Sequence, residues 1–212
     1  MTITVSHQKG GVGKSTTSWN LAIELSKIIK VEVVDLDVQQ TVSLNNVVRK
    51  KLGMTSLNVR TFKDIDKFKD FISSDSDDKI ILIDTGAYDS GLNRLAVLVA
   101  DLVVTPVSSS TVELQGLETY RLIIEELNKG SKEVVKPFVL LNSVDTRLKK
   151  LDSLKKHIKE SGFDLFDTVV RRRIDFVTSL TNGKSVVEYD SSSNSSNEIS
   201  SLINEIKKIL SI

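Results

Sequence analysis

The sequence predicts an α/β fold, in which one domain spanning residues 1–212 forms a doubly wound, mostly parallel sheet with helices on both faces. Short runs of Val, Ile and Leu alternate along the chain with longer segments whose apolar residues recur every three or four positions. The short runs are almost continuously apolar, which is typical of parallel strands covered on both sides. Two prolines in the whole chain leave little room for linkers.

The strands and helices follow from these two spacings. The clearest strands are residues 3–6, 31–34, 80–83, 102–105 and 138–141. Helical spacing predicts helices over residues 14–29, 41–51, 64–72, 92–99, 112–127 and 147–160. Ligands of such sheets bind beyond the carboxyl ends of the strands, so the residues just after each strand are the candidates for a site.

The Ser-rich stretch at residues 191–197 has two interpretations, a flexible linker or the start of a last helix. Ser195 followed by Glu198 has the spacing of a capping box, and apolar residues then recur on one face. We therefore predict a last amphipathic helix over residues 197–212.

Composition excludes several kinds of chemistry. The chain has no cysteine, which removes disulfides, thiolate nucleophiles and Cys-based metal sites. Its two histidines, His7 and His157, lack an acid–base partner in the sequence and are interpreted as structural or surface residues. No export signal or apolar run of membrane-spanning length is present, so we expect a cytoplasmic protein.

A glycine-rich loop follows the first predicted strand and leads into a helix. Glycines let backbone N–H groups surround a phosphate, and the positive end of the helix adds to the attraction. A lysine contacts the β- and γ-phosphates, and a following hydroxyl binds Mg²⁺. The loop predicts a site for ATP and Mg²⁺, with these residues binding the nucleotide: Gly10, Gly11, Val12, Gly13, Lys14, Ser15 and Thr16.

The loop departs from the usual phosphate-binding pattern at its first position. Gln8 stands where that pattern has its first glycine, and a second lysine, Lys9, follows. Lys9 and Lys14 together form the deviant Walker A motif of P-loop NTPases. Here the sequence resembles the ParA/MinD family of deviant Walker ATPases.

The resemblance continues along most of the chain. Residues 33–39 resemble the second family motif, with Val38 in place of proline, and residues 80–86 resemble a Walker B strand ending in Asp84, with Gly86 in place of proline. Asn142 matches the asparagine that contacts adenine, although Ser143 replaces the usual arginine. Residues 170–188 resemble the C-terminal pattern of the small plasmid-partition ParA proteins, the ParF type.

The resemblance implies an ATPase and assigns its carboxylates. Asp37 would orient the attacking water, and Asp84 would hold Mg²⁺ through a bound water. Asp35 either supports the metal or is a strand-end carboxylate satisfied by backbone N–H groups. Lys9 would reach the phosphates of a second copy across an ATP-dependent homodimer, in the manner of an arginine finger.

The family binds nonspecific DNA through C-terminal basic residues when ATP pairs two copies. The whole chain is nearly neutral, but residues 144–173 hold nine basic and five acidic side chains. A solvated Lys-rich helix face is the other interpretation of this charge. The residues expected to contact DNA are Arg171, Arg172, Arg173, Lys149 and Lys150.

The resemblance thus implies plasmid or chromosome partition. Hydrolysis stimulated by a small centromere-binding ParB- or ParG-like protein would release a nucleoid-associated dimer. One alternative is a MinD-like ATPase that positions itself on a membrane, although the last helix has only Lys207 and Lys208 as cations. Another is a conjugation or accessory regulator that keeps the fold and dimerises.

Overall fold

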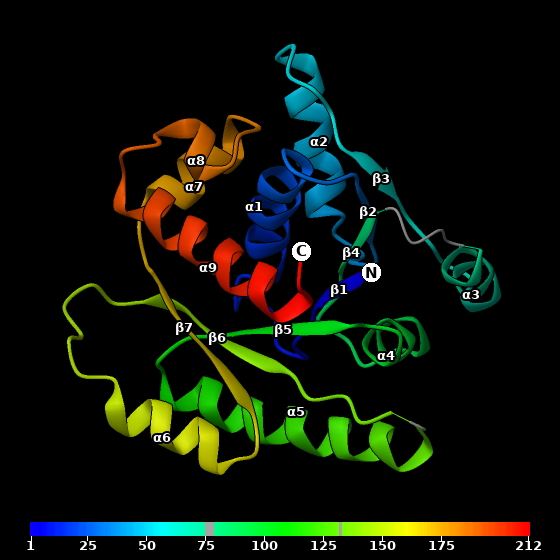
Figure 1. Ribbon diagram of the computed structural model, residues 1–212, viewed down its shortest axis with the longest axis vertical. Helices are drawn as coiled ribbons and strands as arrows, with labels where there is room; N and C mark the ends of the chain where they lie inside the picture. The colour runs from blue at the N-terminus through cyan, green and yellow to red at the C-terminus, as the bar shows by residue number, and fades with distance from the viewer. Residues whose placement is uncertain (75–78, 132) are drawn as a thin grey trace.

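A parallel sheet organises the protein (Figure 1). The computed structural model describes residues 1–74, 79–131 and 133–212, and within them seven strands pair in the order β3-β2-β4-β1-β5-β6-β7. Each of these pairings is parallel, which confirms the predicted doubly wound α/β fold. The strands are β1 (Thr2–Val5), β2 (Val31–Asp35), β3 (Asn58–Arg60), β4 (Ile80–Asp84), β5 (Leu102–Val107), β6 (Phe138–Val144) and β7 (Asp164–Arg171).

The helices cover both faces of this sheet. α1, α2 and α7 to α9 pack on one face, and α3 to α6 pack on the other, so α1 and α9 lie above the strands in Figure 1 and α5 and α6 below them. The helices are α1 (Lys14–Ser26), α2 (Thr41–Lys51), α3 (Ile65–Ser73), α4 (Gly91–Leu98), α5 (Thr111–Gly130), α6 (Asp152–Glu160), α7 (Asp175–Thr181), α8 (Val186–Tyr189) and α9 (Asn194–Leu210).

Alternate residues of the central strands pack on opposite faces, as a pleated strand requires. On β2, Val33 joins the apolar cluster that contains residues of α1 and α9, whereas Val34 joins the cluster that contains Phe68 of α3. Because both clusters are apolar, these strands are apolar at consecutive positions. No helix among the described residues is long and apolar enough to cross a bilayer.

The register of the sheet places three strand ends side by side. Val5 at the end of β1 pairs with Asp84 at the end of β4, and Asp84 pairs in turn with Asp35 at the end of β2. The chain therefore leaves these three strands at one edge of the sheet. The glycine-rich loop and the two carboxylate segments that follow β2 and β4 meet there.

Several expected elements differ in the structure. β3 and β7 were not predicted, because β3 is short and polar and the apolar residues of β7 are interrupted by Asp167 and Thr168 rather than running as one apolar stretch. The helix expected over residues 147–160 begins only at Asp152, since Asp145 accepts hydrogen bonds from the backbone and side chain of Arg147 and shapes a turn there.

The predicted capping box at the start of the last helix is wrong. α9 begins after Ser193, whose hydroxyl accepts from the N–H of Ser196 at 3.1 Å. Ser195 instead donates to Asp175 of α7, and Glu198 accepts from the N–H of Arg171. The same four-residue pattern does form a capping box before α8, where its serine and glutamate are Ser185 and Glu188.

Candidate functional site

The glycine-rich loop wraps the N-terminus of α1. Gly11 and Gly13 adopt φ angles of 79° and 93°, a left-handed backbone that residues with a Cβ rarely adopt. Lys14 then starts the helix, so the free N–H groups of the first turn point toward the loop. This arrangement forms an anion site from backbone alone.

Asn142, at the end of β6, braces the loop from the side. Its Nδ2 donates to the carbonyl of Val12 at 2.8 Å, and the pair is buried. A Cβ at Gly13 would overlap this Nδ2, so only glycine allows the close approach. The structure thus places Asn142 beside the nucleotide loop and shows its amide nitrogen holding that loop.

Lys14 lies inside the loop rather than in solvent. Its side chain is buried, and its Nζ donates to the carbonyl of Lys9 at 2.8 Å. Burial lowers the pKa of Lys14, while the negative charges of Asp84 and Asp37 oppose that shift. The ammonium of Lys14 is thus held near two carboxylates. When a nucleotide binds, we expect phosphate oxygens to replace the carbonyl of Lys9 as its hydrogen-bond partner.

Asp84 ends β4 as a buried carboxylate with one free oxygen. Its Oδ1 accepts from the hydroxyl of Ser18 at 2.7 Å, whereas its buried Oδ2 has no hydrogen-bond partner among the described residues. Burial raises the pKa of Asp84 to about 7, although the neighbouring hydroxyls of Ser15 and Ser18 act to lower it. An orphaned carboxylate oxygen beside Ser15 is the donor set that Mg²⁺ prefers.

The two carboxylates at the carboxyl end of β2, Asp35 in the strand and Asp37 just after it, differ in their surroundings. Asp35 accepts from both the N–H and the hydroxyl of Ser43, at 2.9 and 2.8 Å, and from the N–H of Asp37 at 3.2 Å. These bonds hold the start of α2 and match the structural interpretation of Asp35. Asp37 is only half-buried, and its Oδ1 accepts from the N–H of Gln39.

Part of this arrangement lines one open hollow. Its lining includes the glycine-rich loop with Lys14 and Ser15, the Asp37 and Val38 segment, and Ala87 and Tyr88 after β4. Gly86 lies close to the backbone of Asp37: a Cβ added to Gly86 would stand 3.6 Å from the Cα of Asp37. A nucleotide with Mg²⁺ fits this donor set: backbone amides and Lys14 for phosphates, Ser15 and the free Asp84 oxygen for the metal.

Helix α5 contacts the loop on its other side, a feature that sequence reasoning missed. The buried ring of His7 stacks on Tyr120 of α5, with ring centroids 5.4 Å apart. Burial lowers the pKa of His7 to about 3, with smaller contributions from Lys14 and Lys9, so the ring is neutral. Its Nδ1 accepts from the N–H of Lys9 at 3.0 Å. The available signal was Gly116, a glycine inside a predicted helix.

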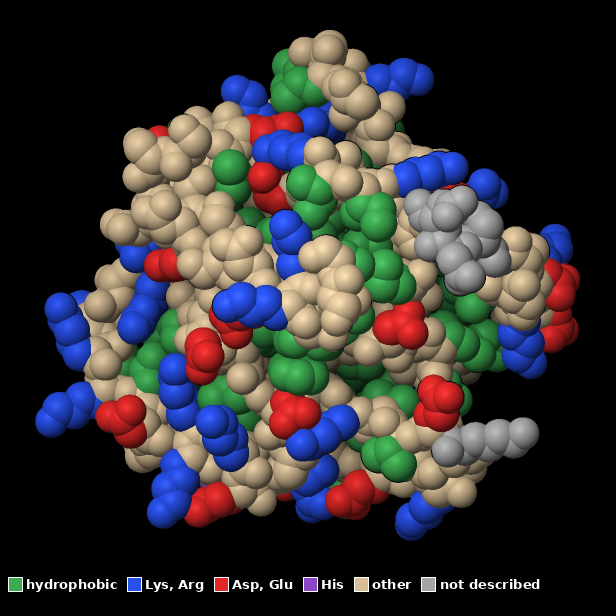
Figure 2. Space-filling model, in the orientation of Figure 1, with side chains coloured by type: hydrophobic (Ala, Val, Ile, Leu, Met, Phe, Trp, Pro, Cys, Tyr) green, Lys and Arg blue, Asp and Glu red, His purple; other side chains and the backbone are tan. Residues whose placement is uncertain are grey.

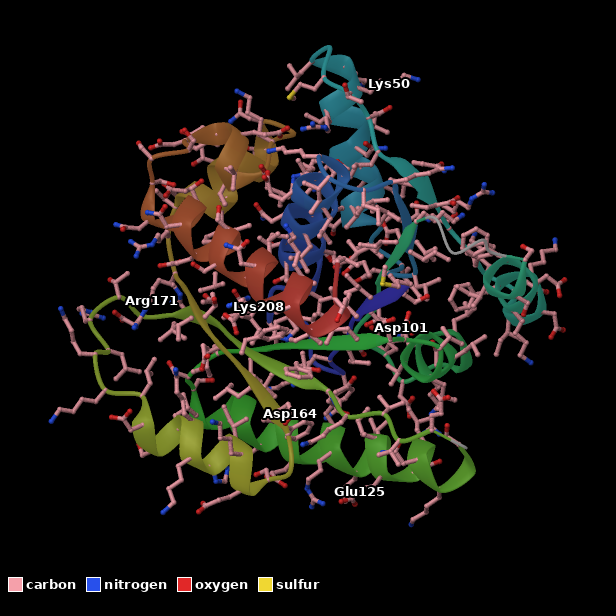
Figure 3. The ribbon with its side chains drawn as sticks, in the orientation of Figure 1. Lys50, Asp101, Glu125, Asp164, Arg171 and Lys208 are labelled. Atoms are coloured by element: carbon pink, nitrogen blue, oxygen red, sulfur yellow. The ribbon has the colours of Figure 1, made fainter. Side chains whose placement is uncertain are left out.

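The three consecutive arginines at the end of β7, which begin with its last residue, do not form one free cationic face. Arg171 donates to the carbonyls of Asp145 and Leu148, so it ties the end of β7 to the chain that leaves β6 (Figure 3). Arg173 forms an ion pair with Glu198 of α9 at 3.0 Å. Arg172 is exposed and its Nε donates to the hydroxyl of Ser143.

The remaining predicted DNA contacts are exposed. Lys149 and Lys150 lie in the segment between β6 and α6, and with Arg172 they make up what we call the basic patch. Figure 2 shows Lys and Arg side chains gathered at the lower left of the molecule, over α6 and the segment before it, with acidic side chains between them.

Comparison with known proteins finds similarity along most of the chain. The model of one family, described as the CobQ/CobB/MinD/ParA nucleotide binding domain, matches residues 3–186. The maintenance of carboxysome distribution protein A of Halothiobacillus neapolitanus is 23% identical over 207 residues, which cover 97% of this chain and 95% of that protein. The chromosome-partitioning ATPase Soj of Thermus thermophilus is 25% identical over 217 residues, covering 88% of this chain and 87% of Soj.

A solved structure shares the fold. The septum site-determining protein MinD of Pyrococcus horikoshii, complexed with Mg-ADP, superposes with a TM-score of 0.74 at 18% identity. The match covers 99% of this chain and 98% of that protein.

Proposed function

Because the chain belongs to the CobQ/CobB/MinD/ParA family of nucleotide-binding domains, we propose that it is a Mg²⁺-dependent ATPase of the partition type. The observation that carries this proposal is the meeting of Lys9, Lys14, Asp37 and Asp84 at one edge of the sheet. The Mg-ADP bound by the Pyrococcus protein supports a magnesium nucleotide as the ligand. ATP binding would drive dimerisation, and hydrolysis would end it.

Each residue has a definite task in the proposed reaction. The amides of the loop and Lys14 bind and orient the phosphates of ATP. Ser15 and Asp84 would hold Mg²⁺, whose charge, when it is bound, would offset that of the phosphate oxygens. Asp37 orients the attacking water from the opposite wall of the hollow. Asp35 fixes the start of α2 and so the place of Asp37.

Lys9 supplies the dependence on a second copy. In the proposed homodimer it reaches the phosphates bound by the partner and stabilises the charge that develops during transfer. We expect Lys9→Ala to retain ATP binding and to lose hydrolysis and ATP-dependent dimers. Normal turnover by a monomeric Lys9→Ala protein would contradict this role.

The proposed target of the dimer is nonspecific DNA. The basic patch is exposed and lacks the spacing of a base-reading motif, so it suits phosphate contacts that weaken as salt rises. Two copies would double a modest positive charge. The name of Soj, a chromosome-partitioning ATPase, supports this assignment. The name of the Halothiobacillus relative, which concerns carboxysome distribution, means that cargo other than DNA is to be considered as well.

The proposed partner is a small centromere-binding ParB- or ParG-like protein that stimulates hydrolysis. The expected location is the cytoplasm, on the nucleoid when ATP is bound.

The alternative of membrane positioning in the manner of MinD is disfavoured by the placement of α9. Its apolar residues Ile199, Leu202 and Ile206 are buried in the core, so this face is not available to lipid.

The test compares two targets under two nucleotides. The protein is incubated with ATP or ADP and then sedimented with random-sequence DNA or with vesicles containing anionic lipid. We expect ATP-dependent binding to DNA that falls steeply with salt, and no binding by the Lys14→Ala control. ATP-dependent binding to vesicles without binding to DNA would overturn the partition assignment.

A further inference from the structure

A glycine stands in the interior of α5, where it weakens the helix relative to alanine. A Cβ at Gly116 would lie 2.6 Å from Cδ of Lys9 and 3.4 Å from its Cγ. The aliphatic stem of Lys9 therefore lies directly against the backbone of α5. No other residue type leaves room for this contact.

Two further contacts bind the same segment to α5, and a third bond connects Lys9 to one of them. Gln8 donates from Nε2 to the carbonyl of Gly116 at 3.1 Å. The N–H of Lys9 donates to Nδ1 of His7, whose ring stacks on Tyr120 one turn further along α5. The neutral state of His7 keeps this Nδ1 available as an acceptor. The start of the glycine-rich loop is thus attached to α5 through both backbone and side chains.

The opposite side of Lys9 faces the phosphate-binding lysine. The carbonyl of Lys9 accepts from Nζ of Lys14 at 2.8 Å. Lys9 consequently lies between α5 and the hollow, with its stem against the helix and its carbonyl toward the position of the phosphates. All of these contacts of Lys9 are within its own chain, whereas the proposed function requires Lys9 to contact the nucleotide of a second copy.

We propose that Gly116 is a positioning residue for Lys9: it provides a docking place on α5 that holds the lysine stem within its own chain until dimerisation releases it. The inference rests on the proposed function, in which Lys9 crosses to the partner. Releasing the stem gives up its packing on α5, so the docked position raises the protein concentration at which dimers form. Gly116 thereby helps to keep the protein monomeric at low protein concentration.

The test uses two Gly→Ala changes on the same helix. Gly116→Ala would push aside the flexible stem of Lys9, whereas a Cβ at Gly130 would meet no described atom within 4 Å. Gly130→Ala is therefore the matched control. Each change is made in the natural protein and in the Lys9→Ala variant, which lacks the Cγ and Cδ that a Cβ at position 116 would strike.

The first measurement is thermal unfolding without nucleotide. We expect Gly130→Ala to leave Tm unchanged or to raise it by about 2 °C in both backgrounds. Gly116→Ala should lower Tm when Lys9 is present and raise it, as the control does, when Lys9 is Ala. Equal Tm values for Gly116→Ala and Gly130→Ala, or an equal loss in both backgrounds, would overturn the docked position.

The second measurement is self-association with ATP, followed by analytical ultracentrifugation. Gly116→Ala should lower the concentration at half-assembly about threefold or more, with unchanged ATP affinity of the monomer and unchanged turnover per dimer. An unchanged or raised half-assembly concentration relative to Gly130→Ala would overturn the role of docking in dimerisation. Natural protein that never self-associates with ATP would instead contradict the proposed function, and the unfolding comparison separates these two failures.

Discussion

Arg49 connects α2, which follows the Asp37 segment, to the C-terminal helices. The guanidinium is buried and donates to both carboxylate oxygens of Glu188, at 2.7 and 2.8 Å, and to the carbonyls of Gly183 and Thr55. A Cβ at Gly183 would stand 2.7 Å from the Cα of Arg49, so the two segments touch through their backbones. The change that isolates this connection is Arg49→Met, which keeps most of the aliphatic stem.

The expected loss follows from the burial of the pair. The side chain of Arg49 is 8% exposed and that of Glu188 is 22% exposed. Removing one partner of a buried ion pair leaves the other charge uncompensated and typically costs about 3–5 kcal/mol. Because Glu188 retains some contact with water, we expect Arg49→Met to lower the free energy of unfolding by about 3 kcal/mol.

Urea unfolding followed by circular dichroism measures this loss. The matched control is Arg121→Met, since Arg121 also forms ion pairs, with Glu118 and Glu125, but on the exposed face of α5. The control should change stability little, because water already solvates these three charges. A loss at Arg49 no larger than that at Arg121 would refute the reasoning.

The same pair predicts a dependence on pH. Burial raises the pKa of Glu188, but hydrogen bonds from Arg49 and from the N–H of Ser185 outweigh it, and the pKa lies below its ordinary value. A carboxyl group whose pKa is lowered in the folded protein contributes to stability. This contribution is complete above the pKa of the unfolded state, about 4.3, and is lost as pH falls through the pKa of the folded state. The difference in stability between the natural protein and Arg49→Met should therefore shrink below about pH 4.

Three further predictions concern the site. Gly13→Ala should abolish ATP binding, measured by titration calorimetry, because it places a Cβ on Asn142 and strains a backbone with φ of 93°; affinity within about twofold of the natural value would contradict this reading. Asp84→Asn should bind ATP but lose Mg²⁺-dependent hydrolysis in a phosphate-release assay, and normal turnover would exclude Asp84 from the metal site. Replacing the three residues of the basic patch by Ala should weaken DNA binding uniformly across sequences and flatten its salt dependence, whereas an unchanged salt slope would place the DNA surface elsewhere.

Local patterns were sufficient where the chemistry is local. The glycine-rich loop with Lys9 and Lys14 is continuous in the chain, and the strands that end at Asp35 and Asp84 are short apolar runs. Patterns failed where a distant segment supplied another hydrogen-bond partner. The spacing of Ser195 and Glu198 suits a capping box, but Ser195 bonds to Asp175 of α7 and Glu198 to the N–H of Arg171 at the end of β7.

The sequence by itself determined the α/β fold, the nucleotide loop and the family, because strand periodicity and a glycine-rich loop are encoded within short stretches. Only the tertiary structure decided which charged groups remain available. It uses Arg171 and Arg173 to hold β7 in place and leaves Arg172 exposed, although the three are consecutive in the chain. It also places Lys9 against Gly116, more than a hundred residues away. Burial and hydrogen bonding depend on which distant segments meet, and sequence spacing does not record that.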